Sequence, residues 1–135
     1  MAVYFDHPID APESSGAPIQ LTWHPVSPVL AVASSSPSSG GTVDVYMQQG
    51  DFVEKCHLER SYQPTVVHWH PTKPVLAVGW GNGEVILLTY PSGDHTALPN
   101  THSVSCTLLK WSGLGSRLVT GDQVKTRFES HRSRL

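Results

Sequence analysis

The apolar residues of this chain fall in short runs separated by turn-forming residues, and no segment shows a helical period of about 3.6 residues. The runs are rich in valine, isoleucine, leucine and aromatic residues, which suit pleated, half-buried strands. Eleven glycines and eleven prolines break the pattern between the runs, as in chains full of turns. We therefore expect an all-β fold with strands at 19–23, 29–33, 42–47, 52–58, 65–69, 74–79, 84–90, 95–98, 104–111 and 117–121.

The pattern repeats along the chain. The segment Trp69–Val78 reads WHPTKPVLAV and matches Trp23–Val32, WHPVSPVLAV, at eight of ten positions. A weaker third copy occupies Trp111–Thr120, so the leading tryptophans lie 46 and then 42 residues apart. A period of about 40–45 residues with short strands inside it is typical of propeller blades.

Each copy predicts a strand, a tight turn and a second strand. Pro71 and Pro74 fix the backbone and cannot donate to a strand ladder, so only one turn fits between the flanking strands. The apolar run 75–78 that follows is typical of a strand covered on both faces. Asn82-Gly83 then predicts a hairpin turn.

We expect residues 1–122 to form an incomplete WD-repeat β-propeller of about two and a half to three blades. Blade one spans about 19–58, blade two about 64–98, and the start of blade three about 104–122. The repeat pattern fails after Asp122, and the remaining residues, 123–135, carry four of the nine lysines and arginines. We expect a disordered, basic tail there. Since propellers have at least about four blades, these units cannot close a ring by themselves.

Composition narrows the classes of function. The chain has 135 residues, a net charge of −2 and only 15% charged residues, so it has no strong field for nucleic acid or an anionic membrane. No apolar stretch approaches the roughly 18 residues of a membrane span, and the N-terminus lacks a signal-peptide pattern. We expect no nucleic-acid partner and no membrane insertion. Cys56 and Cys106 are expected to be free thiols in a reducing compartment.

The four tryptophans are the candidate structural and binding residues. Trp23, Trp69 and Trp111 occupy equivalent positions of the three copies, so we interpret them as structural anchors packed between neighbouring blades. Trp80 has no counterpart in the other copies. We expect it to lie exposed beside the Asn-Gly hairpin, where it could contact a partner protein.

Metal and catalytic sites are not predicted. His68 and His70 could share one face of a strand, but zinc needs three or four ligands and Cys56-His57 is the only other dense group. We expect instead that His68 is partly buried and that His70 holds a turn. The chain has no Gly-x-Ser-x-Gly elbow, and Gly81-Asn82-Gly83 lacks the helix of a dinucleotide loop. A zinc-dependent hydrolase is thus the remotest hypothesis, and we predict no enzyme activity, no metal and no cofactor.

The Trp-His-Pro units are similar to WD-repeat blades, although Tyr46 and Leu88 replace the tryptophan of the usual Trp-Asp ending. A longer set of segments resembles the extreme N-terminus of a core subunit of intraflagellar transport complex A. The resemblance covers roughly residues 1–122. The segments that carry it, besides the two Trp-His-Pro units, are Met1–His7, Ala77–Trp80 with Gly83–Val85, and Leu109–Ser112 with Gly121-Asp122.

This resemblance implies a non-enzymatic protein-interaction scaffold that is truncated after about residue 122. It implies a role in retrograde transport inside cilia and in delivery of membrane proteins to cilia. The implied partners are the other complex A subunits and ciliary membrane-protein cargo adaptors, and the implied locations are cilium, cytoplasm and ciliary base. The alternative is an autonomous small β-sheet binding module unrelated to complex A. Localisation and pull-down of complex A subunits would distinguish the two.

Overall fold

The computed structural model describes residues 16–37, 40–99, 102–124 and 126–130, and every regular element within them is a β-strand. In chain order the strands are β1 (Ala17–Trp23), β2 (Val29–Ser36), β3 (Gly40–Met47), β4 (Phe52–Arg60), β5 (Pro64–Trp69), β6 (Val75–Trp80), β7 (Val85–Thr89), β8 (His95–Ala97), β9 (Leu108–Trp111), β10 (Arg117–Gly121) and β11 (Thr126–Ser130).

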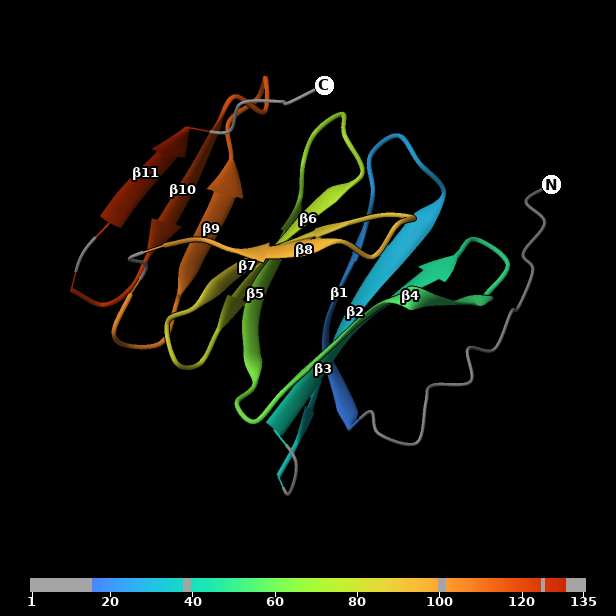
Figure 1. Ribbon diagram of the computed structural model, residues 1–135, viewed down its shortest axis with the longest axis horizontal. Helices are drawn as coiled ribbons and strands as arrows, with labels where there is room; N and C mark the ends of the chain where they lie inside the picture. The colour runs from blue at the N-terminus through green and yellow to red at the C-terminus, as the bar shows by residue number, and fades with distance from the viewer. Residues whose placement is uncertain (1–15, 38–39, 100–101, 125, 131–135) are drawn as a thin grey trace, which may run out of the picture.

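The strands form three antiparallel sheets, in the orders β1-β2-β3-β4, β5-β6-β7-β8 and β9-β10-β11. Each sheet is built from consecutive strands, and the three sheets lie side by side in chain order (Figure 1). The all-β class and the open, partial propeller predicted from the sequence are confirmed. Among the first strands of the sheets, β5 contacts both β1 and β9.

The apolar run of each repeat forms the second strand of its sheet, and in the second sheet this strand, β6, is covered on both faces. In β6, Leu76, Val78 and Trp80 lie in the core between the first and second sheets. Ala77, which points the other way, lies in the core between the second and third sheets. A strand covered on both faces reads as a continuous apolar run rather than an alternating one, and β6 matches this.

Turn chemistry sets the ends of the strands. Between β6 and β7, the backbone N–H of Gly83 donates to the carbonyl of Trp80 at 3.0 Å, and the Asn82 side chain accepts from Glu84 N–H at 3.0 Å. Gly83 has a φ of +92°, in the left-handed region that favours glycine. A Cβ there would also lie 2.0 Å from the carbonyl oxygen of His102. The Asn-Gly pair therefore lies at the turn that the sequence predicts.

The end of the chain differs from the expected disordered tail. Residues 126–130 form β11, which pairs in register with β10 from Gly121↔Thr126 to Arg117↔Ser130. The third sheet therefore has three strands and extends beyond Asp122. The sequence signal is weak because charged residues interrupt this strand, and backbone pairing with β10 forms it all the same. Residues 125 and 131–135 of the expected tail lie outside the described residues.

Candidate functional site

The seam between the first and second sheets is held by a tryptophan and a histidine from consecutive copies of the repeat. The indole N–H of Trp69 donates to the backbone carbonyl of Thr22 at 3.0 Å. The His24 ring pairs its Nε2 with the carbonyl of Lys73 at 2.8 Å. The His24 and Trp69 rings pack edge to face, with centroids 5.1 Å apart and an interplanar angle of 79°. We call this arrangement the Trp–His clasp.

The same clasp holds the seam between the second and third sheets. The indole N–H of Trp111 donates to the carbonyl of His68 at 3.2 Å, and His70 Nε2 pairs with the carbonyl of Gly115 at 3.0 Å. The His70 and Trp111 rings pack edge to face, with centroids 4.8 Å apart. Each seam thus takes its histidine from the earlier sheet and its tryptophan from the later one. The Trp-His pair of the repeat encodes the contact between blades.

The tautomer of the His70 ring follows from its other contacts. His70 Nδ1 accepts from the backbone N–H groups of Thr72 and Lys73, at 3.2 and 2.9 Å. Because two donors point at Nδ1, this nitrogen carries no hydrogen, and Nε2–H donates to the carbonyl of Gly115. His70 therefore holds a turn, as predicted, and both of its ring nitrogens are committed to backbone groups. Gly115 has a φ of +76°, and a Cβ on it would lie 2.1 Å from His70 Nε2.

Trp23 differs from the other two predicted anchors. Trp69 and Trp111 are each 3% exposed and make the clasp, whereas Trp23 is 52% exposed. The prediction that Trp23 is packed between blades is wrong for this structure. The reason is that its clasp partner would belong to a preceding sheet, and the described residues contain none. The anchor role is a property of a seam rather than of the repeat position alone.

The prediction for Trp80 is also wrong. Trp80 is 0% exposed and lies in the core between the first two sheets. It alternates along β6 with Leu76 and Val78, so its side chain points to the same face as theirs, toward the first sheet. The Tyr62 ring packs edge-on at 6.0 Å, and the Arg60 guanidinium lies 6.0 Å from the indole centroid. Its indole N–H has no hydrogen-bond partner among the described residues. A partner protein cannot reach this side chain.

A hollow of about 510 Å³ lies at the inner end of the stack, where the three units converge. Each of the three units contributes its repeat tryptophan (Trp23, Trp69 or Trp111) and part of the turn that follows it. Each unit also contributes the residue before its tryptophan, which is Thr22, His68 or Lys110. Burial and the charge of Lys110 lower the pKa of His68, so this ring favours its neutral form. The wall is largely aromatic, with one cationic side chain, Lys110.

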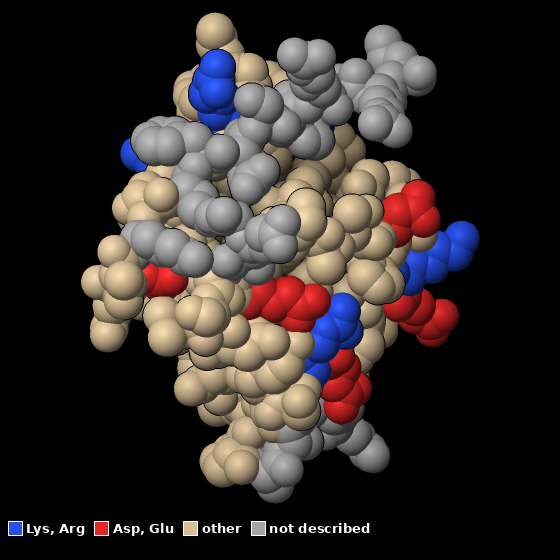
Figure 2. Space-filling model, turned by 60° about the vertical axis from the view of Figure 1, so that its left-hand side comes forward, with Lys and Arg blue, Asp and Glu red and all other residues tan. Residues whose placement is uncertain are grey.

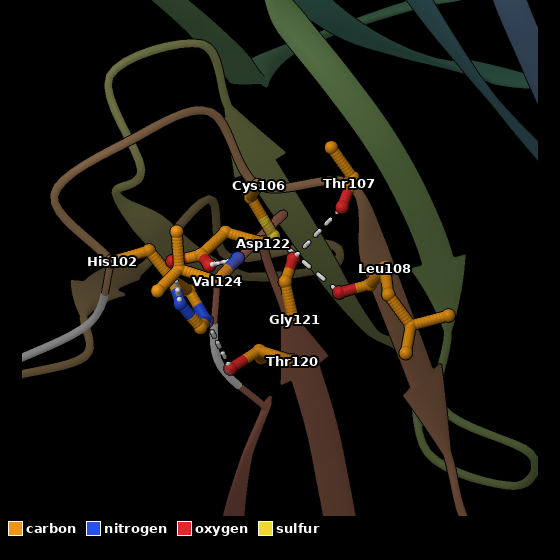
Figure 3. Close-up of polar contacts among 8 residues, drawn as sticks. All are labelled: His102, Cys106, Thr107, Leu108, Thr120, Gly121, Asp122 and Val124. Atoms are coloured by element: carbon orange, nitrogen blue, oxygen red, sulfur yellow. Dashed lines mark hydrogen bonds and ion pairs between the residues drawn. The ribbon is translucent and has the colours of Figure 1, made fainter.

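Three buried polar side chains in the third unit form a chain of hydrogen bonds (Figure 3). His102 Nδ1 lies 2.7 Å from an Asp122 carboxylate oxygen, and His102 Nε2 lies 2.8 Å from the Thr120 hydroxyl. The order hydroxyl, imidazole, carboxylate is that of a hydrolase triad. The His102 and Asp122 side chains are 0% and 1% exposed, and Thr120 is 0% exposed, so no substrate reaches the hydroxyl.

The buried chain instead fixes the loop before β9 against the end of β10. Asp122 also accepts from the backbone N–H of Val124 at 2.6 Å (Figure 3). Sequence reasoning missed this network, although the strand-ending pair Gly121-Asp122 was part of the recognised pattern. The signal that could have found it is a histidine in the connection before the third copy of the repeat.

The first sheet contains another imidazole–carboxylate contact, between a half-buried histidine and a buried aspartate. Asp44 on β3, 1% exposed in its side chain, contacts Nδ1 of His57 on β4 at 2.5 Å. Burial lowers the pKa of His57, but the hydrogen bonds and charges of Asp44 and Glu59 outweigh that effect and raise it overall. Among the described residues, no group of three or more histidine, cysteine or acidic side chains is arranged to hold a metal ion.

The visible charges are dispersed. Figure 2, which brings the side of the third sheet forward, shows acidic and basic side chains lying beside one another on a surface that is mostly uncharged. Among the described residues on this face, the two signs of charge lie beside one another and form no large patch of one sign for a polyanion. Within the part of the chain that the structure describes, no helix has the length and apolar character to cross a membrane.

Comparisons with known proteins identify the architecture. The model of the family described as "IFT140 first beta-propeller" matches residues 2–127. Among solved structures, the crystal structure of the computationally designed Ika4 protein is similar with a TM-score of 0.65 and 13% sequence identity. That match covers 84% of this chain and 65% of the designed protein, so this chain spans just under two thirds of its length. At this identity the likeness concerns the fold alone.

Proposed function

The chain belongs to the family of the IFT140 first β-propeller, and on that premise we propose that it acts as a non-enzymatic interaction scaffold within intraflagellar transport complex A. The observation that carries the proposal is the family match itself, which runs from residue 2 to residue 127 of 135. A propeller of this family is a structural module, so its expected activity is binding.

The geometry is compatible with such a role. Two successive Trp–His clasps and two buried cores hold the three sheets as one stack, which offers a preformed surface to a partner. A preformed surface lowers the conformational entropy lost on binding. The hydroxyl–imidazole–carboxylate chain of His102, Thr120 and Asp122 is sealed in the interior, where no substrate reaches its hydroxyl.

Three finer elements belong to the same proposal. The first is a role in retrograde transport within cilia and in delivery of membrane proteins to them. The second is contact with other complex A subunits and, through them, with ciliary membrane-protein cargo adaptors. The third is residence in the cilium, at its base and in the cytoplasm. The support for all three is the match to a complex A propeller family.

The test is expression of the tagged 135-residue chain in ciliated cells, with imaging and co-precipitation of complex A subunits. We expect enrichment at the cilium and recovery of complex A subunits. The matched controls are Trp69→Ala, which removes the first clasp, and Val26→Ala, which changes a side chain that is 70% exposed. The first should lose the subunits and the second should keep them.

A folded chain that recovers no complex A subunit and shows no ciliary enrichment would refute the proposal. Recovery of an unrelated partner by that folded chain would instead support the autonomous binding module. Circular dichroism of the purified protein establishes the folded state, since the expected spectrum is that of a β-sheet protein.

A further inference from the structure

The first sheet presents an exposed apolar row on the face away from the second sheet. Ile19, Leu21 and Trp23 alternate along β1 and are 51%, 61% and 52% exposed. The residues between them point to the second sheet, where the Gln20 side chain accepts from a backbone N–H of β5 at 2.9 Å. The carbonyl of Thr22 accepts the indole N–H of the first clasp. The outward row is therefore the face that a preceding sheet would cover.

A hollow of about 190 Å³ opens on this same face. Its walls are mostly apolar and come from the first three strands: Gly16, Pro18, Leu21, Leu30, Val32, Ser34 and Tyr46. In the second sheet, the equivalent face is filled by side chains of the first sheet and forms the larger core. The first sheet thus has the same surface without its cover among the described residues.

The opposite end of the stack carries one part of the clasp, the backbone carbonyl that would accept an indole N–H. Lys110 stands immediately before Trp111, in the position that Thr22 and His68 occupy in the first two units. In those units, the carbonyl at this position accepts an indole N–H from the next sheet. Beside it, Leu108 is 49% exposed on the same side of β9 as Lys110. The outer side of β9 therefore presents the Lys110 carbonyl as a candidate hydrogen-bond acceptor and the Leu108 side chain as an apolar contact.

We propose that a second copy of this chain docks head to tail, so that the β1 row of one copy covers the outer face of the third sheet of the other. In this arrangement the Trp23 indole N–H of one copy donates to the Lys110 carbonyl of the other. The argument is continuity: the contact repeats, between copies, the tryptophan-to-carbonyl hydrogen bond of the two seams within each copy. The tryptophan and the carbonyl position for this bond are both present on one chain.

The intermolecular seam differs from the internal ones in one respect. Ser112 stands where His24 and His70 stand in the first two units, so the third sheet supplies no imidazole to the partner's tryptophan. The docking is therefore weaker than an internal seam and depends on concentration. A head-to-tail contact closes into a ring or grows into a filament. Two copies contribute six sheets, within the range of about four to eight that propellers close.

The experiment uses two charge variants of the full 135-residue chain, Leu21→Asp on the first sheet and Leu108→Asp on the third. Both change exposed side chains, so each variant should keep its β-sheet spectrum and cooperative unfolding. Size-exclusion chromatography with light scattering should give a dimer for the unmodified chain and a monomer for each variant alone. An equimolar mixture should recover the dimer, because one seam still joins two unmodified faces.

Two further variants test the position of the contact and the role of the indole N–H. Val124→Asp changes a side chain that is 84% exposed in the connection between β10 and β11, outside the strands of both faces, and should dimerise like the unmodified chain. Trp23→Phe keeps an aromatic ring but removes the indole N–H. It should raise the dimer dissociation constant roughly five- to hundredfold, because a dimer closed by two seams loses the indole hydrogen bond at both.

Three outcomes overturn the proposal. One is a monomer at all concentrations, and another is a mass that grows steadily without stopping at two copies. The third is a dimer that persists in Leu108→Asp alone, because that result would place the contact between two first-sheet faces.

Discussion

Replacing Trp69 by alanine should destabilise the fold far more than replacing Trp23, although the two residues occupy the same position of the repeat. Trp69 is 3% exposed and Trp23 is 52% exposed. A tryptophan buries roughly 150–250 Å², so the difference is about 100 Å² of apolar surface. At about 25 cal/mol per Å² this is about 2.5 kcal/mol, and the indole hydrogen bond adds about 1 kcal/mol.

We therefore expect Trp69→Ala to lower the free energy of unfolding by about 3–5 kcal/mol, as for other large-to-small core changes. Trp23→Ala should lower it by about 1–2 kcal/mol, which leaves a gap of about 3 kcal/mol between the two variants. Trp69→Phe isolates the N–H, since it keeps most of the ring but leaves the Thr22 carbonyl without its donor. That variant should lie between the other two.

The assay is urea unfolding followed by circular dichroism, at a concentration where light scattering shows a monomer for every variant. This condition keeps intermolecular docking of Trp23 out of the comparison. If Trp69→Ala is unfolded without urea, an osmolyte such as trimethylamine oxide restores a measurable baseline for all variants. Equal losses at Trp69 and Trp23, or a gap below about 1 kcal/mol, would show that the clasp does not hold the seam.

Three more predictions concern side chains outside the clasp. Trp80→Ala should cost as much as Trp69→Ala in urea unfolding, because Trp80 is fully buried; a loss under about 1 kcal/mol would contradict its place in the core. The pKa of His57 is raised above its ordinary value of 6.5, so its stabilisation is complete below that value and declines as pH rises through the folded pKa. Unfolding midpoints across this range should show the decline, and Asp44→Asn should reduce it, because Asp44 raises the pKa of His57 more than Glu59 does. Burial raises the pKa of the Cys56 and Cys106 thiols, so both should react slowly with a thiol reagent until urea unfolds the chain.

Much of the fold was predictable because the residue types of the repeat indicate where its strands and turns lie. The prolines of the Trp-His-Pro segments stop one strand and start the next, and the apolar run after them must be covered on two faces. The observed strands β2, β6 and β10 lie where these runs predict them. The charged strand β11 was missed because its alternation is weak and its formation depends on pairing with β10.

The site residues were harder to predict, because burial depends on what lies on the far side of a sheet. Trp23 and Trp69 have the same local sequence, and only the presence of a neighbouring sheet separates an exposed ring from a buried one. For Trp80, proximity to a hairpin suggested exposure, whereas strand alternation with Leu76 and Val78 points it into the core. The partnership of His102 with Asp122 joins two loops, and no local pattern reports it.

The clasp joins residues on neighbouring sheets, so the chain between those residues forms a loop. The length of this loop is set by the spacing of the repeat. The hydrogen bonds of the clasp join residues 47 and 49 apart at the first seam, and 43 and 45 apart at the second. Since the entropic cost of closing a loop depends on its length, each new sheet costs about the same as the one before it. The sequence separation of contacts therefore stays constant while a chain of such units grows. During synthesis on the ribosome, each sheet can dock as soon as one further unit has emerged.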